Sequence, residues 1–207
     1  MSLTPPELPQ DAAYTPYWCE ENVYLLIQSF LRNTSLSEIW EVFAVFISNH
    51  SKTVALWNQK LSKEPGQPVI WDYHVVAVLR PRKFSSNLHS WVYDLDTRLD
   101  LPVTWNSKLE RSYSSFQSCQ HRNNSLFRVV SANVYLDRFA SDRSHMLART
   151  PPGTLPNPNY LQPAPPYPPL RGPQCMSTHN LMNFVSMLSF NDYGDVFDIK
   201  GISGFFA

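Results

Sequence analysis

The sequence is short of cysteine, carries no excess charge of either sign, and has no long apolar run. Its three cysteines are Cys19, Cys119 and Cys175, and an odd number without a CxxC pair argues against the disulfide framework of a small secreted domain. Lysine and arginine together number 17, as do aspartate and glutamate. A protein that binds nucleic acid through its phosphates usually has a basic excess. No apolar run approaches the roughly 20 residues that span a bilayer.

The opening residues indicate where the protein works. Residues 1–10 are proline-rich and acidic, and the first basic residue is Arg32. This pattern fits neither a secretory signal nor an arginine-rich transit peptide. We therefore expect reduced thiols and a cytoplasmic location that also extends to the nucleus, with neither nucleic acid nor membrane as a partner.

What is present is the composition of a folded domain. Hydrophobic residues make up 43% and aromatic residues 14% of the 207 positions, enough for one domain with a substantial core. We expect a single catalytic domain over residues 1–207, working as a monomer, that begins with a loose arm at 1–13. Residues 150–173 are dense in proline, which excludes a helix or a central strand and predicts a proline-rich loop.

The first predicted element is an amphipathic helix over residues 19–31. Apolar residues fall at the spacing of one helical face, namely Val23, Leu26, Ile27, Phe30 and Leu31. Counting back four residues from Val23 reaches Cys19, so the thiol projects from the first turn on the face that packs against the core. Glu20 and Glu21 follow it, where the helix dipole favours acidic residues.

A strand-rich block follows this helix. The apolar run 42–47 and the segment 54–57 are separated by a turn and predict a hairpin. Further strands are expected at 68–79, 90–97 and 127–136, and a weak helix at 181–190. One helix in front of mainly antiparallel strands predicts an α+β fold, with the cysteine-bearing helix packed on the sheet.

Two of the predicted strands place polar side chains where a core is expected. Alternation puts Asp72 and His74 on one face of the first strand, and Asp94 and Asp96 on one face of the second. If the strands are neighbours, either carboxylate of the second can accept the second N–H of the imidazole. The bland alternatives are a satisfied core histidine and carboxylates that mark an edge strand.

Together with Cys19, these groups are what nucleophilic hydrolysis of an amide requires. A helix N-terminus or a nearby imidazolium lowers the pKa of a thiol, so we expect a reactive Cys19. The thiolate attacks a carbonyl, His74 protonates the departing nitrogen, and a carboxylate fixes the tautomer of the imidazole. The chain order Cys, His, Asp is that of papain-type enzymes. The alternative for Cys19 is a small apolar core residue.

Several segments resemble the protein N-terminal glutamine amidohydrolase family in the same order. They are Tyr17-Trp-Cys-Glu-Glu-Asn-Val-Tyr24, Phe46-Ile-Ser-Asn49, Pro68-Val-Ile-Trp-Asp-Tyr-His-Val-Val76, Val92-Tyr-Asp-Leu-Asp-Thr97, Phe139-Ala-Ser-Asp-Arg-Ser-His-Met146 and Pro165-Pro-Tyr-Pro168. The resemblance implies a papain/transglutaminase-like fold and a Cys-His-Asp triad without a cofactor. It assigns Cys19 as nucleophile, His74 as base and acid, and Asp94 as the residue that orients His74.

The implied reaction converts the side-chain amide of an N-terminal glutamine, on a protein or peptide with a free α-amine, into glutamate plus ammonia. By the same resemblance, the product is an N-degron that is arginylated and degraded. Asp72 or Asp142 could bind the substrate ammonium, and Tyr17 and Trp18 together with the proline-rich loop are expected to form the pocket rim.

Other readings of the chain remain open. The same triad would also serve a papain-like peptidase or a transglutaminase-like acyltransferase. A non-catalytic interaction module would instead use the Pro-x-x-P motif of residues 166–171 as its functional part. Two Cys/His pairs, Cys119 with His121 and Cys175 with His179, have irregular spacing for zinc, so no metal site is expected.

Overall fold

The computed structural model describes residues 3–83, 88–113, 125–148, 159–189 and 193–206. Its largest feature is a twisted sheet in the order β6-β5-β4-β1-β7-β8, in which all neighbours are antiparallel. A separate two-stranded sheet is made of β2 and β3. The strands are β1 (Trp40–Ser48), β2 (Val54–Leu56), β3 (Val69–Trp71), β4 (His74–Pro81), β5 (Trp91–Tyr93), β6 (Val103–Thr104), β7 (Leu126–Ser131) and β8 (Asp195–Phe197).

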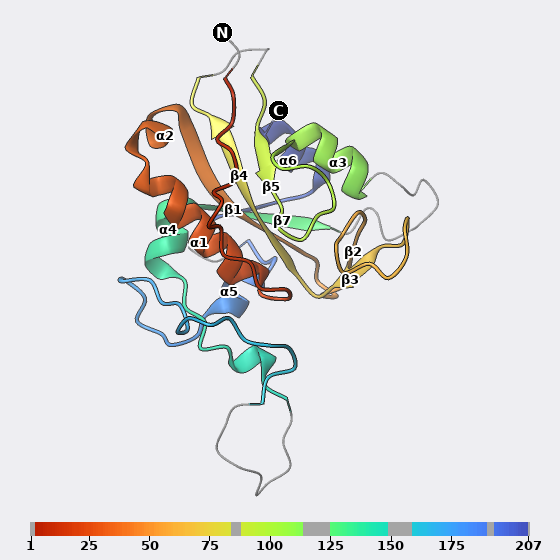
Figure 1. Ribbon diagram of the computed structural model, residues 1–207, viewed down its shortest axis with the longest axis vertical. Coiled ribbons are helices and arrows are strands. Elements are labelled where there is room, and N and C mark those ends of the chain that lie inside the picture. Colours follow the sequence, from red (N-terminus) through yellow and green to blue (C-terminus); the bar gives the residue numbers. More distant parts are fainter. Residues whose placement is uncertain (1–2, 84–87, 114–124, 149–158, 190–192, 207) are drawn as a thin grey trace, which may run out of the picture.

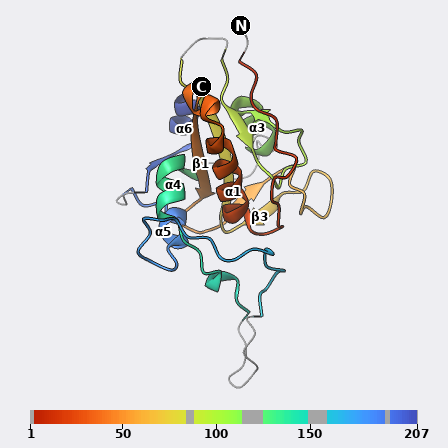
Figure 2. The same cartoon turned by 60° about the vertical axis from the view of Figure 1, so that its left-hand side comes forward.

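Helices cover both faces of the large sheet (Figures 1 and 2). They are α1 (Cys19–Arg32), α2 (Thr34–Ile39), α3 (Trp105–Tyr113), α4 (Ala132–Arg138), α5 (Leu181–Val185) and α6 (Ile199–Phe206). One apolar core joins α1, α4 and α5 to the sheet, and a second core on the other face joins α3 and α6 to it. The α+β fold class with a mainly antiparallel sheet is therefore confirmed. No helix in the described ranges is long and apolar enough to cross a bilayer.

The strand β1 is the centre of the sheet because its sequence is apolar on both faces. Every residue of β1 except Glu41 is buried, as expected for a strand covered on both sides. The strand pairs with β4 through Ile47↔His74 and with β7 through Ile47↔Phe127. The predicted hairpin of residues 42–47 with 54–57 is wrong, because β4 and β7 already occupy both edges of β1. The strand β2 pairs with β3 instead.

Three other predicted elements differ from the structure. The expected strand at 68–79 is divided into β3 and β4 by a bend at Asp72. The strand expected at 127–136 ends at Ser131, and α4 follows it. The expected strand at 90–97 ends at Tyr93, so Asp94 and Asp96 lie in a turn closed by the bond from the Thr97 N–H to the Asp94 carbonyl.

The two irregular segments of the chain are attached to the core. In the N-terminal arm, Leu3 and Leu8 pack on the core of α1, and the Tyr93 hydroxyl donates to the Pro6 carbonyl. The arm therefore contacts the core at these three residues. The chain after α4 and the chain before α5 run side by side away from the sheet (Figures 1 and 2), joined by the bridges Ala140↔Arg171 and Leu147↔Tyr160. The described part of the proline-rich loop, from residue 159 on, contains no helix or ladder strand.

Candidate active site

The helix α1 begins at Cys19, as its amphipathic spacing predicts. Val23 and Ile27, one and two turns further on, are buried in the same core as Cys19. The thiol donates to Glu20 Oε2 at 3.7 Å, and its contact with the backbone of Val75 in β4 lowers its pKa against the larger effects that raise it. The thiol therefore lies beside the residue that follows His74, although no hydrogen bond joins Cys19 to His74 in the described chain.

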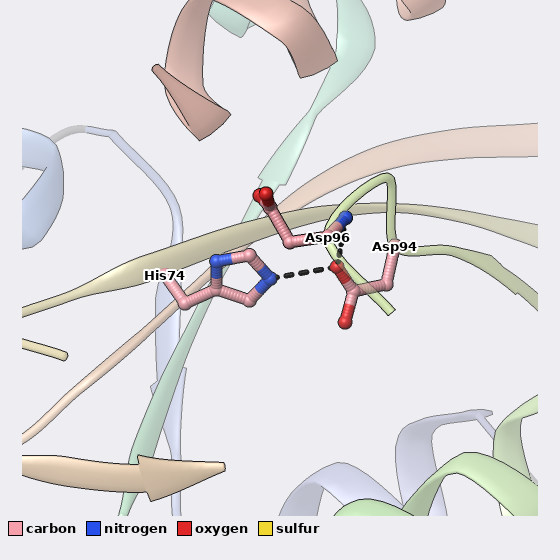
Figure 3. A group of neighbouring side chains, drawn as sticks. All are labelled: His74, Asp94 and Asp96. Carbon is pink, nitrogen blue, oxygen red and sulfur yellow. Dashed lines mark hydrogen bonds and ion pairs between the residues drawn. The ribbon is translucent and has the colours of Figure 1, made fainter. Parts of the chain in front are cut away.

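His74 and Asp94 form a buried pair. Both side chains are fully buried, and His74 Nε2 lies 2.8 Å from Asp94 Oδ1 (Figure 3). The Trp71 ring stacks on the imidazole at 5.0 Å between centroids. The other ring nitrogen, Nδ1, has no hydrogen-bond partner among the described residues. An ionised Asp94 selects the tautomer in which Nε2 carries the proton and Nδ1 has a free lone pair.

Asp94 is held in its ionised form by an unusual number of donors. Besides His74, its oxygens accept from Gln59 Nε2 at 3.1 Å, from the Asp96 backbone N–H at 3.0 Å and from Lys108 Nζ. Burial alone would raise the pKa of Asp94, but the charges of Lys108 and His74 and their hydrogen bonds hold it well below its usual range. The carboxylate is thus fixed in both position and charge.

Asp96 lies near His74 but has a different partner. One oxygen accepts from the Tyr14 hydroxyl at 2.8 Å, while the backbone N–H of Asp96 supports Asp94 (Figure 3). Burial and the neighbouring Asp94 charge raise the pKa of Asp96. Of the two carboxylates that the sequence offered, Asp94 is the one that contacts the imidazole.

The thiol environment differs from the prediction. Burial, followed by the charges of Glu20 and Asp96, raises the pKa of Cys19 well above its usual range, whereas the sequence predicted a lowered value. The helix N-terminus favours the thiolate, but in the folded chain the loss of water and three nearby carboxylates outweigh it. The resting form of Cys19 is therefore the neutral thiol.

A second buried polar network lies on the other side of Cys19. Glu20 Oε2 accepts from the Tyr73 hydroxyl at 3.0 Å, and Glu20 Oε1 lies 3.3 Å from His145 Nε2 in a geometry that does not make a hydrogen bond. Glu21 pairs with Arg143 through two bonds of 2.9 and 2.7 Å. These contacts join α1 to the segment Ser141–Met146, which the sequence singled out without assigning its charged residues a partner in α1.

A cavity of about 470 Å³ opens beside the thiol. Its lining is mostly apolar and combines residues from around α1 and β3 with others from the chain between α4 and α5: Tyr17, Cys19, Leu61, Val69, Ile70, Trp71, Asp72, Tyr73, His145, Met146, Leu161 and Met182. Concave, mainly apolar sites with a few polar groups are typical of small-ligand binding. Leu161 belongs to the proline-rich loop, so this loop forms part of the wall.

The predicted substrate-binding residues lie in different surroundings. Asp72 and Tyr17 line the cavity, but the bend at Asp72 removes this residue from the face of His74 and leaves it exposed. Trp18 was expected at the rim. It is fully buried and donates from Nε1 to the Pro163 carbonyl at 2.8 Å. Asp142 is not among the lining residues; it accepts from the Ser144 N–H and pairs with His179.

Two sets of side chains are candidates for metal binding: the cluster around His74 and the two Cys/His pairs of the sequence. Ligand atoms of His74, Asp94 and Asp96 lie within 4.8 Å of one another, but Lys108 already supplies a cation to this cluster and the Asp94 oxygens accept four hydrogen bonds. Of the zinc candidates, Cys119 and His121 lie outside the described residues. The Cys175 sulfur contacts Ser177 and Asn180. The donor set near His74 therefore suits a hydrogen-bonded pair better than a metal centre.

Sequence reasoning missed Lys108 and Gln59, the two side chains that bind the second oxygen of Asp94. A helical signal for Lys108 was available, because Trp105, Lys108 and Ser112 recur at three and four residues and are all buried on one face of α3. Gln59 follows β2 in a loop and offered no comparable pattern.

An imidazole with one free nitrogen, a fixed carboxylate behind it and a cysteine at the start of a buried helix are the groups that a thiol-dependent amide hydrolase uses. The chain also resembles known proteins of this class. The family model for N-terminal glutamine amidase matches residues 14–206.

Individual relatives extend this match over most of the chain. The protein N-terminal glutamine amidohydrolase of Homo sapiens is 36% identical over 201 residues, covering 95% of this chain and 89% of its own length. Its namesakes from Drosophila mojavensis and Drosophila grimshawi are 35% and 34% identical, over 95% and 92% of this chain and 89% and 86% of theirs. The chain belongs to the N-terminal glutamine amidase family.

Proposed function

We propose that this protein hydrolyses the side-chain amide of an N-terminal glutamine, leaving glutamate and ammonia, with Cys19 as nucleophile, His74 as base and acid, and Asp94 as the residue that orients His74. The observation that carries this proposal is the buried His74–Asp94 pair, in which His74 Nδ1 has no partner among the described residues. Cys19, the cysteine that would react, lies in the wall of a cavity. The membership in the amidase family supplies the reaction class.

The chemistry proceeds in two halves. Cys19 Sγ attacks the side-chain carbonyl carbon of the glutamine while His74 Nδ1 takes the thiol proton, and the imidazolium gives this proton to the departing nitrogen, which leaves as ammonia. The result is a thioester on Cys19. A water molecule then attacks the thioester carbonyl, His74 accepts a proton from this water, and the thiol is regenerated as glutamate leaves. The Cys19 backbone N–H, in the first turn of α1, would stabilise the oxyanion.

The raised pKa of Cys19 defines the order of proton transfer. Because the resting thiol is neutral, the proton moves to His74 as the sulfur attacks, so His74 must be unprotonated at Nδ1 beforehand. Asp94, hydrogen-bonded to Nε2, keeps that nitrogen aimed correctly. A contact between Sγ and Nδ1 that is open in the free enzyme closes when substrate fills the cavity, as is common for catalytic hydrogen bonds.

Recognition of the free α-amine is best supported at Asp72. It is the one carboxylate among the described residues that line the cavity, and its Oδ1 accepts from the Tyr73 N–H at 2.9 Å. Asp142 points to other partners. Tyr17, His145 and Leu161 enclose the same cavity and would exclude chain upstream of the glutamine. Trp18 supports this wall from behind through its bond to the proline-rich loop.

The wider assignments follow from the same proposal. The cysteine-bearing helix on an antiparallel sheet, with the chain order Cys19, His74, Asp94, suits a papain/transglutaminase-like fold. An N-terminal glutamate product would enter the arginylation and degradation pathway, and no cofactor is required for the two half-reactions.

The experiment compares three matched peptides that carry the same glutamine at a free N-terminus, at an acetylated N-terminus and inside the chain. Ammonia release and the amide-to-acid mass change are measured for each, together with peptide cleavage. We expect deamidation of the first peptide alone. Similar rates on all three would indicate a general glutaminase or acyltransferase, and peptide cleavage a papain-like peptidase.

A further inference from the structure

The helix α3 buries a lysine beside the candidate active site. Lys108 is only 2% exposed, and its Nζ donates to Asp94 Oδ2. A buried ammonium group is costly unless it is paired, and α3 reaches this position because Trp105 and Ser112 on the same face are buried too. The placement of Lys108 is thus a built feature of the fold.

Lys108 and His74 share one negative charge. Oδ1 of Asp94 accepts from His74 and from the Asp96 backbone, whereas Oδ2 accepts from Lys108 and Gln59. Among the described residues, Lys108 is the only lysine or arginine that pairs with Asp94. A carboxylate already paired with a permanent cation stabilises an imidazolium less than a lone carboxylate does.

The other charged or titratable groups around the pair come from the N-terminal arm and from the loops after β2 and β5, and they are Tyr14, Lys60 and Asp96. Lys60 reaches Asp96 through its charge and the Leu95 carbonyl through its Nζ. Cys19, on α1, lies within range of the Tyr14 and Asp96 charges and is itself faced by Glu20 and Asp72. With Asp96 nearby, an Asp94 without its lysine would stabilise a positive charge on the imidazole more strongly, and a doubly protonated imidazole cannot accept the thiol proton.

We propose that Lys108 is a positioning residue that acts through Asp94: it fixes the carboxylate against His74 and takes up part of its charge, so that Asp94 orients the imidazole without strongly favouring its charged form. This inference rests on the proposed function of His74 and Cys19. It explains why a fully buried lysine lies two hydrogen bonds away from the imidazole. Lys108 touches neither substrate nor thiol and supplies no proton to the reaction.

The test replaces Lys108 with methionine, with glutamine and with arginine, and follows kcat/KM for a Gln-initiated peptide across pH. Removing the buried cation favours protonation of His74, so the acid limb moves to higher pH, by about one to two pH units, in Lys108→Met and Lys108→Gln. Lys108→Arg keeps the charge and holds the limb near its original pH. The control Arg111→Met removes a positive charge from an exposed position of the same helix and leaves the limb unchanged.

A second readout separates this inference from the proposed function. The rate of alkylation of Cys19 by iodoacetamide, followed across pH by peptide mapping, reports the same protonation of His74 without turnover. A matching shift of its acid limb in Lys108→Met and Lys108→Gln supports the inference even if the substrate is another amide. An unshifted limb in folded Lys108→Met or Lys108→Gln, whether or not its rate falls evenly at all pH values, overturns it. If both neutral variants fail to fold, an unshifted limb in Lys108→Arg supports the inference and a shifted one overturns it.

Discussion

Two buried carboxylates of the candidate site, Asp94 and Glu20, are satisfied to very different degrees. Asp94, behind His74, accepts four hydrogen bonds and is paired with the buried cation Lys108. Glu20, next to the thiol in sequence, accepts from the Tyr73 hydroxyl and from the Cys19 thiol at one oxygen. Its other oxygen has no hydrogen bond within the described residues, although His145 lies 3.3 Å away. Both side chains are fully buried.

The difference divides the site into a fixed half, made of His74 and Asp94, and an unfinished half, made of Glu20 and the cavity beside the thiol. In the unfinished half, charge and hydrogen bonds are incompletely matched. In the fixed half, the position and the charge of Asp94 are set in the free protein. This is the preorganisation that the proposed mechanism requires. On the cavity side, Glu20 and Asp72 add negative charge near the thiol and raise its pKa. A substrate with a free ammonium group brings the positive charge that this half lacks, which fits a preference for an N-terminal residue.

The largest effect is expected on the fixed half, in a comparison of Asp94→Asn with Asp96→Asn. An asparagine at position 94 can stabilise the wrong imidazole tautomer, a change that costs about 10⁴-fold in turnover in serine proteases. Asp96 bonds to Tyr14 and not to the imidazole, so its replacement should cost far less. Steady-state kinetics on one Gln-initiated peptide checks this. A more severe loss in Asp96→Asn would move the orienting role to the other carboxylate.

On the unfinished half, Asp72→Asn should weaken the distinction between a free and an acetylated N-terminal glutamine. A hydrogen bond to a charged group contributes roughly 1.5–3 kcal/mol, which corresponds to about one to two decades of discrimination at about 1.4 kcal/mol per decade. The ratio of kcat/KM for the two peptides measures it. Asp142→Asn, at a carboxylate outside the cavity lining, serves as the matched control, and an equal loss of discrimination there would remove Asp72 from the ammonium site.

A smaller effect is expected from Glu20→Gln. The Glu20 charge is one cause of the raised pKa of Cys19, after burial, so its removal should lower this pKa and move the rise of thiol alkylation to lower pH. If the pKa falls by about one, alkylation at a pH below the pKa becomes about tenfold faster, because the thiolate fraction rises in proportion. Glu38→Gln, exposed in α2, is the control. Identical alkylation profiles for wild type and Glu20→Gln would show that the Glu20 charge does not contribute to the thiol pKa.

The sequence analysis placed His74 beside Asp94, as the structure does, although the two predicted strands that carry them differ from the observed elements. Alternation along 68–79 and 90–97 placed the two side chains together, yet the first strand bends at Asp72 and the second ends at Tyr93. The pairing survives because β4 and β5 are neighbours in the sheet. The helix at Cys19 was predicted well because its apolar spacing is regular over three turns.

Other features depended on parts of the chain that are distant in sequence. The hairpin prediction failed because β4 and β7, which come later, take both edges of β1. Lys108 is a residue type that is rarely buried, so its role emerges only once α3 packs beside Asp94. The raised thiol pKa follows from burial by the folded core and then from the charges of Glu20, Asp96 and Asp72. Of these causes, only the Glu20 charge can be read from the local helix around Cys19.

The most direct test of the account is the deamidation of a Gln-initiated peptide by Cys19→Ala, followed by mass spectrometry of the peptide. Cys175→Ala, at the other buried cysteine of the described chain, is the control, and circular dichroism verifies that both variants are folded. We expect deamidation by Cys19→Ala to fall by at least about 10⁴-fold, as for removal of the nucleophile in other hydrolases, and Cys175→Ala to remain active. A folded Cys19→Ala variant that deamidates within about tenfold of wild type, a loss of no more than about 1.4 kcal/mol in transition-state stabilisation, would contradict the role of Cys19 and with it the proposed mechanism.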